Sequence, residues 1–274
     1  VENILATFGG APVLLDHLRG GQVRGIINLV GCNNPKLVYE EAVVRVAQTL
    51  IAHDVIVLTN GCAAYALLKT GYCLPEALRE AGEGLRQVLG PHQLPPVWHM
   101  GECLDNARAT GLFRALADAA NEPLTHVPFA FSSPEWSNEK GVGAALGFRL
   151  LGLNSYHCIE PPIGGSDKVS RFFAEDTQAL LGSVMVVDHD PLALADRIIA
   201  DLDARRATLG WQLSAPPVTT KPATHEHARG HDHDHAHDHD HAAGSAHCNH
   251  SRPSPACGSH SASSRTGVGG EGCG

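Results

Sequence analysis

The sequence predicts an α/β fold, a Rossmann-like doubly wound parallel sheet, followed by a disordered His-rich C-terminal tail. Short apolar runs alternate with segments whose apolar residues recur at helical spacing, as in successive β–α units. This alternation continues as far as Trp211. Beyond it, Pro, Thr, His, Gly and Ser predominate, and such a composition buries too little apolar surface to offset chain entropy. We therefore predict a folded domain over residues 1–212 and a linker with a disordered tail over residues 213–274.

The first three β–α units are marked by their own signals. Residues 4–19 are expected to form a helix that ends at Gly20-Gly21. Residues 37–53 are expected to form an amphipathic helix, and Pro75 opens a further helix at the position that proline favours. The expected strands of this half are 23–30, 55–58 and 95–99, and the expected helices are 4–19, 37–53, 62–69, 75–89 and 104–119.

The second half repeats the pattern. Ser133 and Pro134 form a helix start, with serine as the N-cap and proline in the first turn. Alternation of this kind favours parallel strands, because each helix returns the chain to the same edge of the sheet. The expected strands of this half are 127–131, 156–159 and 184–187, and the expected helical segments are 133–151, 170–181 and 191–209.

The composition argues against several classes of protein. Hydrophobic residues make up 43% of the chain, the net charge is −9, and no basic patch stands out, so we expect no nucleic-acid partner. No apolar run reaches the ~18 residues of a membrane span, and no signal peptide is visible, so we expect a cytoplasmic protein. Eight cysteines in such a chain are expected to stay reduced and to serve a metal site or catalysis.

Three cysteines follow one local pattern of strand, glycine, cysteine and helix. Cys32, Cys62 and Cys103 each come after an apolar run and a glycine. Parallel strands end on one edge, so we expect these thiols to converge there, each at a helix N-terminus whose dipole favours the thiolate. A single cysteine of this kind is commonly a small buried residue, but the repetition favours a metal site. Zinc sites usually carry a Cys-x-x-Cys pair, which is absent from the chain, so a large iron–sulfur type of cluster fits better.

The residues around these cysteines resemble those of a known family. The segments are 31–36 (Gly-Cys-Asn-Asn-Pro-Lys), 59–64 (Thr-Asn-Gly-Cys-Ala-Ala), 99–106 (His-Met-Gly-Glu-Cys-Leu-Asp-Asn) and 134–140 (Pro-Glu-Trp-Ser-Asn-Glu-Lys). In this order they resemble the C-terminal domain of the catalytic subunit of anaerobic nickel–iron carbon monoxide dehydrogenases, which belong to the prismane-like superfamily. The resemblance extends from about Leu5 to Trp211.

The resemblance implies a Ni-Fe-S cluster and the oxidation of CO with water to CO₂, two protons and two electrons, and the reverse reaction. Cys32 and Cys62 correspond to iron ligands and Cys103 to the cysteine that binds nickel. Lys140 corresponds to the lysine that hydrogen-bonds the carboxylate formed from CO and hydroxide. The family pattern has His where this chain has Asn138, which removes a possible proton carrier. The implied partners are a ferredoxin-like electron acceptor and a second copy in a homodimer, with an acetyl-CoA synthase or a hydrogenase as further candidates.

The family's remaining ligands, a His and two Cys, lie upstream of the region that this chain resembles, as do the cysteines of its relay [4Fe–4S] clusters. The chain begins at Val1 rather than Met, so we expect a missing N-terminal portion and no activity from this chain alone. Two alternatives stay open. One is a reductase of the hybrid cluster protein type, whose cysteines occupy corresponding strand ends, and the other is a nickel storage or chaperone protein.

The tail is a second candidate metal site, and the storage alternative depends on it. Neutral imidazole binds Ni²⁺ and other divalent metal ions, and a flexible chain offers many combinations of two to four ligands. The competing interpretation is a solvated low-complexity segment. The histidines alternate largely with Asp and Ala, and they are His225, His227, His231, His233, His235, His237, His239 and His241.

Overall fold

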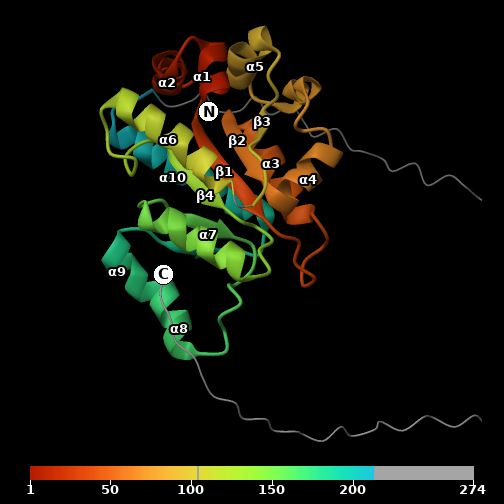
Figure 1. Ribbon diagram of the computed structural model, residues 1–274, viewed down its shortest axis with the longest axis vertical. Helices are drawn as coiled ribbons and strands as arrows, with labels where there is room; N and C mark the ends of the chain where they lie inside the picture. Colours follow the sequence, from red (N-terminus) through yellow and green to blue (C-terminus); the bar gives the residue numbers. More distant parts are fainter. Residues whose placement is uncertain (104, 213–274) are drawn as a thin grey trace, which may run out of the picture. The chain divides into compact units, whose positions relative to one another are not determined.

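The computed structural model describes residues 1–103 and 105–212, and Figure 1 shows how their elements are arranged. Their strands form one parallel sheet in the order β3-β2-β1-β4-β5-β6. This is the strand order of a doubly wound, Rossmann-like sheet, so the predicted fold class is confirmed. The strands are β1 (Gly25–Gly31), β2 (Val55–Asn60), β3 (Val97–His99), β4 (Phe129–Ser132), β5 (Ser155–His157) and β6 (Met185–Val187).

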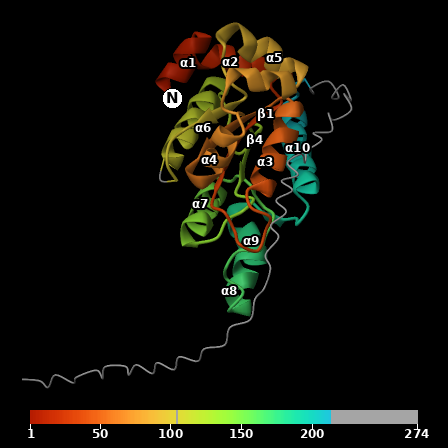
Figure 2. The ribbon, with the colours of Figure 1, turned by 90° about the vertical axis from the view of Figure 1, so that its right-hand side faces the viewer.

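Helices cover both faces of this sheet. In Figures 1 and 2, α3 (Glu41–Ala52) and α10 (Pro191–Thr208) lie side by side on one face, and α6 (Asn106–Ala120) and α7 (Glu139–Leu150) lie on the other. Within the described residues, no helix is long and apolar enough to cross a membrane. The other helical segments are α1 (Glu2–Phe8), α2 (Ala11–Arg19), α4 (Gly61–Lys69), η1 (Pro75–Glu80), α5 (Glu83–Leu89), η2 (Gly90–His92), α8 (Asp167–Arg171), η3 (Phe172–Asp176) and α9 (Thr177–Leu181).

The core lies between the sheet and these helices. Every residue of β2 is buried, and β1 is buried up to its last residue. The helix α3 turns Val43, Val46, Leu50 and Ile51 toward the sheet, at the helical spacing that the sequence predicts. Burial of each large apolar side chain stabilises the fold by roughly 1.5–3 kcal/mol. The central strands are therefore a rigid base for the turns that follow them.

Two predicted helices are divided by glycines. The segment 4–19 forms α1 and α2, because Gly9 and Gly10 take φ values of +84° and +122° and end the first helix. The segment 75–89 forms η1 and α5. Its break lies at Gly82, where an added Cβ would lie 2.2 Å from Oδ1 of Asp54.

Two other predicted helices begin later than expected. The helix predicted from Leu37 begins at Glu41, because Glu40 takes a left-handed φ of +61°. The helix predicted from Ser133 begins at Glu139, because residues 133–138 contact neighbouring loops instead. Both delayed starts belong to loops that follow adjacent strands, β1 and β4.

The chain divides into two units, Val1–Lys221 and Pro222–Gly274. The second unit lies outside the described residues. The predicted linker and tail over residues 213–274 also lie outside them, and the predicted boundary after residue 212 stays a prediction.

Candidate metal centre

The turns that carry Cys32, Cys62 and Cys103 lie at one edge of the sheet. Cys32 follows β1 directly, Cys62 is the second residue of α4 directly after β2, and Cys103 follows β3 by four residues. The three strands are adjacent and parallel, so their carboxyl ends lie together. The three turns therefore lie at one edge, as the sequence predicts, and the convergence of the three thiols on one metal group stays a prediction.

Glycines shape these turns. Gly31 and Gly61, which precede Cys32 and Cys62, pair with each other across the end of the sheet and have φ values of +134° and +65°. A Cβ added to Gly61 would lie 3.1 Å from Cβ of Cys103. Glycine at position 61 therefore allows the left-handed turn and the close approach of the Cys103 turn at the same time.

The electrostatics at Cys62 differ from the expectation. Burial raises the pKa of the Cys62 thiol, and the neighbouring Cys32, Cys103 and Glu102 raise it further. The predicted helix N-terminus is present at Cys62, but it does not lower the pKa of this thiol below its ordinary value. For Cys32 the prediction is wrong, because the chain continues through a loop as far as Glu40 before α3 begins. Partial burial, followed by the neighbouring acidic groups, therefore raises the pKa of the Cys62 thiol where the helix N-terminus was expected to lower it.

The cysteines nevertheless fit one kind of metal group. Cys62 and Cys103 are exposed, Cys32 is half-buried, and none of the cysteines in the described part of the chain is in a disulfide. Among residues 1–103 and 105–212, no three His, Cys, Asp or Glu side chains are grouped closely enough to hold a single metal ion. Single thiolates spread along one edge suit a multinuclear iron–sulfur type of cluster, in which each ligates a different metal atom.

Three asparagines connect the cysteine-bearing turns. Asn28 on β1 and Asn60 at the end of β2 each donate a hydrogen bond from Nδ2 to Oδ1 of Asn106, both at 3.0 Å. Asn106 in turn donates from Nδ2 to the carbonyl oxygen of Cys103 at 3.1 Å. The sequence predictions missed this group. The available signal was the polar Asn28 within the apolar, buried strand β1.

Lys140 lies at the same edge, after the fourth strand. The strand β4 pairs with β1, and Lys140 is the exposed second residue of α7. Asn138 is the N-cap of α7, and its Oδ1 accepts hydrogen bonds from the backbone N–H groups of Lys140 at 3.0 Å and Gly141 at 3.3 Å. The residue that departs from the family pattern therefore fixes the start of the helix that carries Lys140.

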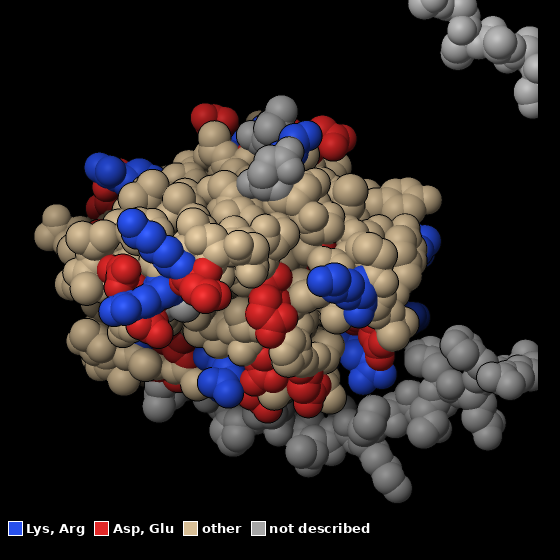
Figure 3. Space-filling view, turned by 90° about the horizontal axis from the view of Figure 1, so that it is seen from below, with Lys and Arg blue, Asp and Glu red and all other residues tan. Residues whose placement is uncertain are grey.

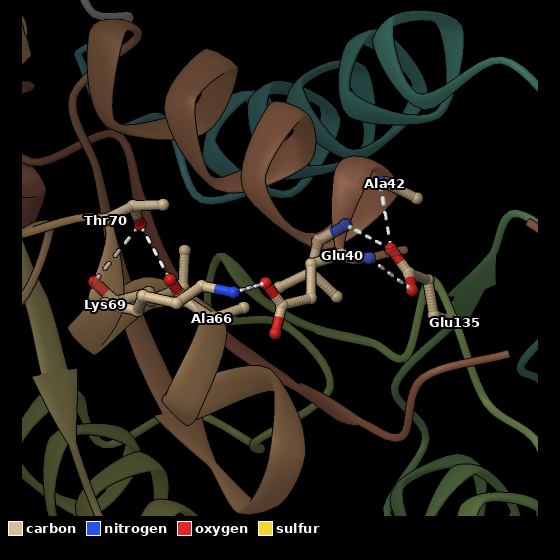
Figure 4. A network of polar contacts seen from close by, with 8 residues as sticks. Glu40, Ala42, Ala66, Lys69, Thr70 and Glu135 are labelled. Carbon is tan, nitrogen blue, oxygen red and sulfur yellow. Dashed lines mark hydrogen bonds and ion pairs between the residues drawn. The ribbon is translucent and has the colours of Figure 1, made fainter. Parts of the chain in front are cut away.

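The loops after β1 and β4 are joined by polar contacts. Asn34 donates from Nδ2 to the carbonyl oxygen of Trp136 at 2.6 Å. The buried carboxylate of Glu135 accepts hydrogen bonds from the backbone N–H groups of Glu40 at 3.2 Å and Ala42 at 2.9 Å, where α3 begins (Figure 4). The chain of contacts fixes the loop after Cys32 against the loop before Lys140.

A further contact connects these hydrogen bonds to α4, the helix that carries Cys62. The Glu40 side chain pairs with the ammonium of Lys69, as Figure 4 shows. That ammonium also lies over the rings of Tyr39 and Tyr65, at 5.4 and 5.8 Å from their centroids. Cation–π contacts of this kind add to the ion pair. Elements that carry Cys32, Cys62 and Lys140 therefore belong to one connected polar group.

The surface in Figure 3 carries charges of both signs. Lys and Arg side chains lie beside Asp and Glu side chains, and other residue types form a broad area between them. Among the residues described on this face, no continuous basic surface is present. The predicted tail ligands, from His225 to His241, lie outside the described residues.

Comparison with known proteins agrees with this arrangement. The Prismane/CO dehydrogenase family matches residues 2–192. The chain is 34% identical over 210 residues to carbon monoxide dehydrogenase 1 of Methanosarcina mazei, covering 76% of this chain and 33% of that protein. It is 38% identical over 208 residues to the carbon monoxide dehydrogenase of Rhodospirillum rubrum, covering 72% of this chain and 32% of that protein. The chain thus spans about a third of the length of these curated relatives.

Solved structures give the same result. A nickel-free crystal structure of carbon monoxide dehydrogenase from Thermococcus sp. AM4 matches with a TM-score of 0.74 and 36% identity, covering 77% of this chain and 34% of that one. A second match is an acetyl-CoA synthase/carbon monoxide dehydrogenase whose α subunits hold NiZn[Fe4S4] and NiNi[Fe4S4] clusters. Its TM-score is 0.71 and its identity 30%, and the match covers 76% of this chain and 33% of that one. The fold defines a doubly wound, Rossmann-like α/β domain whose sheet carries free thiols at one edge. The chain belongs to the Prismane/CO dehydrogenase family.

Proposed function

We propose that this chain is the C-terminal part of an anaerobic carbon monoxide dehydrogenase, an oxidoreductase. The reaction is CO plus water to CO₂, two protons and two electrons, and its reverse. The observation that carries the proposal is the placement of three unpaired cysteines at adjacent strand ends of this family's fold. The relatives described above span about three times the matched length, so we assign the activity to a longer protein rather than to this chain alone.

The cysteines would hold a Ni-Fe-S cluster, with Cys32 and Cys62 on iron and Cys103 on nickel. When bound, this group supplies the redox-active metal that takes up two electrons. The thiolate is the form that ligates metal, so each cysteine must lose its proton on loading. Because the pKa of Cys62 is raised, loading at this edge is favoured as the pH increases.

Lys140 would act on the oxygen atoms of the substrate. Its ammonium is a cationic hydrogen-bond donor, and it stabilises the negative charge that develops on oxygen as CO is converted to CO₂. The amide of Asn138 cannot carry a proton at neutral pH, whereas a histidine can. Lys140 is a candidate for proton transfer in its place, because a lysine near a metal site can carry a proton.

The remaining assignments follow the same proposal. Electrons would pass through [4Fe–4S] clusters outside this chain to a ferredoxin-like acceptor, in a cytoplasmic homodimer. An acetyl-CoA synthase is a candidate partner, because one similar structure is a complex of that enzyme with carbon monoxide dehydrogenase. The relatives described above are named carbon monoxide dehydrogenases, which favours this activity over a reductase of the hybrid cluster protein type.

The test is anaerobic metal analysis together with CO-dependent reduction of a viologen dye, on the protein in its natural length. We expect nickel and iron in the wild type, and loss of nickel and of CO oxidation in Cys103→Ala. Cys73→Ala is the matched control, because Cys73 is a half-buried cysteine that follows α4. A wild-type protein loaded with nickel and iron that oxidises no CO would contradict the proposal.

The tail would bind Ni²⁺ or another divalent metal ion through His225 to His241, for storage or delivery. Nickel titration with and without residues 213–274 tests this assignment. We expect the additional nickel to be lost as the pH falls below ~6, because protonated imidazole does not coordinate metal. Equal nickel binding with and without the tail would contradict it.

A further inference from the structure

Several hydrogen bonds hold the turn that carries Cys103, among them one from the N–H of Glu102 to Oδ2 of Asp105 at 2.7 Å and one from Arg108 to the carbonyl oxygen of Met100 at 3.0 Å. On one side, the N–H of Gly61 donates to the carbonyl oxygen of Gly101 at 3.2 Å. On the other side, Nδ2 of Asn106 donates to the carbonyl oxygen of Cys103 at 3.1 Å. The Cys103 side chain itself is exposed, so packing does not hold it from the solvent side. The position of this thiol therefore depends on its backbone contacts.

The Asn106 amide is itself fixed by the sheet. Its Oδ1 accepts hydrogen bonds from Asn28 and Asn60, so both lone pairs of that oxygen are occupied. Rotation of the Asn106 side chain would break both bonds. Asn28 and Asn60 are fully buried in β1 and β2 and cannot follow such a rotation. The Cys103 carbonyl is thus tied to the two strands that lead to Cys32 and Cys62.

Burial of these amides lowers the stability of the fold. Oδ1 of Asn28 and Oδ1 of Asn60 are both buried without a hydrogen-bond partner within the described residues. An unpaired buried oxygen lowers stability, and the inward positions around Asn28 on β1 are otherwise apolar. A leucine or valine at position 28 would avoid that cost. The amides instead provide directed bonds between the three cysteine-bearing units.

We propose that Asn28, Asn60 and Asn106 are positioning residues that set the distance between Cys103 and Cys62. In the proposed function, on which this consequence rests, Cys103 is the nickel ligand. A displaced Cys103 would then lower nickel occupancy while the iron ligands Cys32 and Cys62 keep their places. The distance between the Cys62 and Cys103 thiols can be measured in the metal-free protein.

The test compares Asn106→Ala with Asn154→Ala in the full 274-residue chain. Asn154 is a matched control, because it is a partly buried asparagine that accepts a hydrogen bond from the N–H of Val184 in the other half of the sheet. The metal-free proteins are treated with a short bifunctional thiol reagent, and the Cys62–Cys103 cross-link is quantified by mass spectrometry. We expect the cross-link yield to fall at least threefold in Asn106→Ala and to stay unchanged in Asn154→Ala.

A second measurement reports the metal. In anaerobically matured protein of natural length we expect the nickel-to-iron ratio to fall by at least half in Asn106→Ala, with rescue by Asn106→Ser, whose hydroxyl both accepts and donates hydrogen bonds. If Asn106→Ala fails to fold, Asn28→Leu, which removes one donor to Oδ1 of Asn106, gives the same comparison. A folded variant with unchanged cross-linking and nickel-to-iron ratio would overturn the inference. A wild type that oxidises no CO would overturn the proposed function but leave the cross-linking result valid.

Discussion

Cysteines follow strands in both halves of the sheet, but their exposure to solvent differs. In the half formed by β1, β2 and β3, Cys62 and Cys103 are exposed and Cys32 is half-buried. In the half formed by β4, β5 and β6, Cys158 follows β5 directly but is fully buried. Burial raises the pKa of Cys158 to about 12. A place at the end of a strand therefore does not by itself make a thiol available.

The difference lies in the glycine that precedes Cys32, Cys62 and Cys103 by one or two residues. Gly31 and Gly61 take positive φ values and turn the chain out of the sheet before Cys32 and Cys62. Cys158 follows His157 without such a turn. Its N–H donates to the carbonyl oxygen of Pro134 at 3.1 Å, and its carbonyl accepts from Nδ1 of His189 at 3.0 Å. The chain after β5 thus remains in the core.

The largest expected effect is on thiol reactivity. In metal-free protein we expect iodoacetamide to modify the exposed Cys62 and Cys103 at least roughly tenfold faster than the buried Cys158. A pKa of about 12 leaves Cys158 with about a thousandth of the thiolate of an ordinary cysteine, and burial protects it further. Mass spectrometry of peptides after timed quenching measures the rates. Equal rates for Cys62 and Cys158 would contradict the comparison.

The second effect concerns the glycine turn. Gly61→Ala should lower the free energy of unfolding by about 1–3 kcal/mol, because residue 61 has a φ of +65° and the new Cβ would lie 3.1 Å from Cβ of Cys103. Gly147→Ala is the control, since it lies in α7 with open space around it and should raise stability by about 0.5–1 kcal/mol. Urea denaturation measures both. A Gly61→Ala protein as stable as the wild type would show that the turn does not need glycine.

The third effect belongs to the second half of the sheet. His157 is fully buried, its ring stacks on Trp136 at 3.6 Å between centroids, and burial lowers its pKa to about 3. The unfolded chain binds a proton on this ring below about pH 6.5, and the folded chain does not. The stability that comes from the neutral ring is therefore complete above pH 6.5 and is lost as the pH falls toward 3.

Between pH 7 and pH 5, this difference should cost the wild type about 2 kcal/mol of unfolding free energy. His157→Phe keeps an aromatic ring against Trp136 but has no titrating group, so its stability should change less over the same range. Denaturation midpoints at several pH values give the two slopes. If the free energy of unfolding of both proteins changed equally with pH, His157 would not be the cause of the pH dependence.

Much of the fold could be predicted from the sequence because its signals are local. Every strand was expected within a few residues of its place, since short apolar runs between turns are typical of buried parallel strands. The starts of α3 and α7 could not be predicted. Residues 133–138 contact the start of α3 instead of continuing as helix: the Glu135 carboxylate accepts a hydrogen bond from the N–H of Glu40 across 95 positions in the chain, and α7 begins only after its N-cap Asn138. No local pattern in either segment reports that contact.

The sequence by itself determined which cysteines follow strands and where glycines allow the chain to leave the sheet. Only the tertiary structure decided which thiols are exposed and what holds them in place. Asn28 and Asn106 are separated by 78 positions, yet their side chains share a hydrogen bond beneath Cys103. Periodicity and turn chemistry act over a few residues, whereas a bond between two strand ends depends on how the whole sheet is assembled.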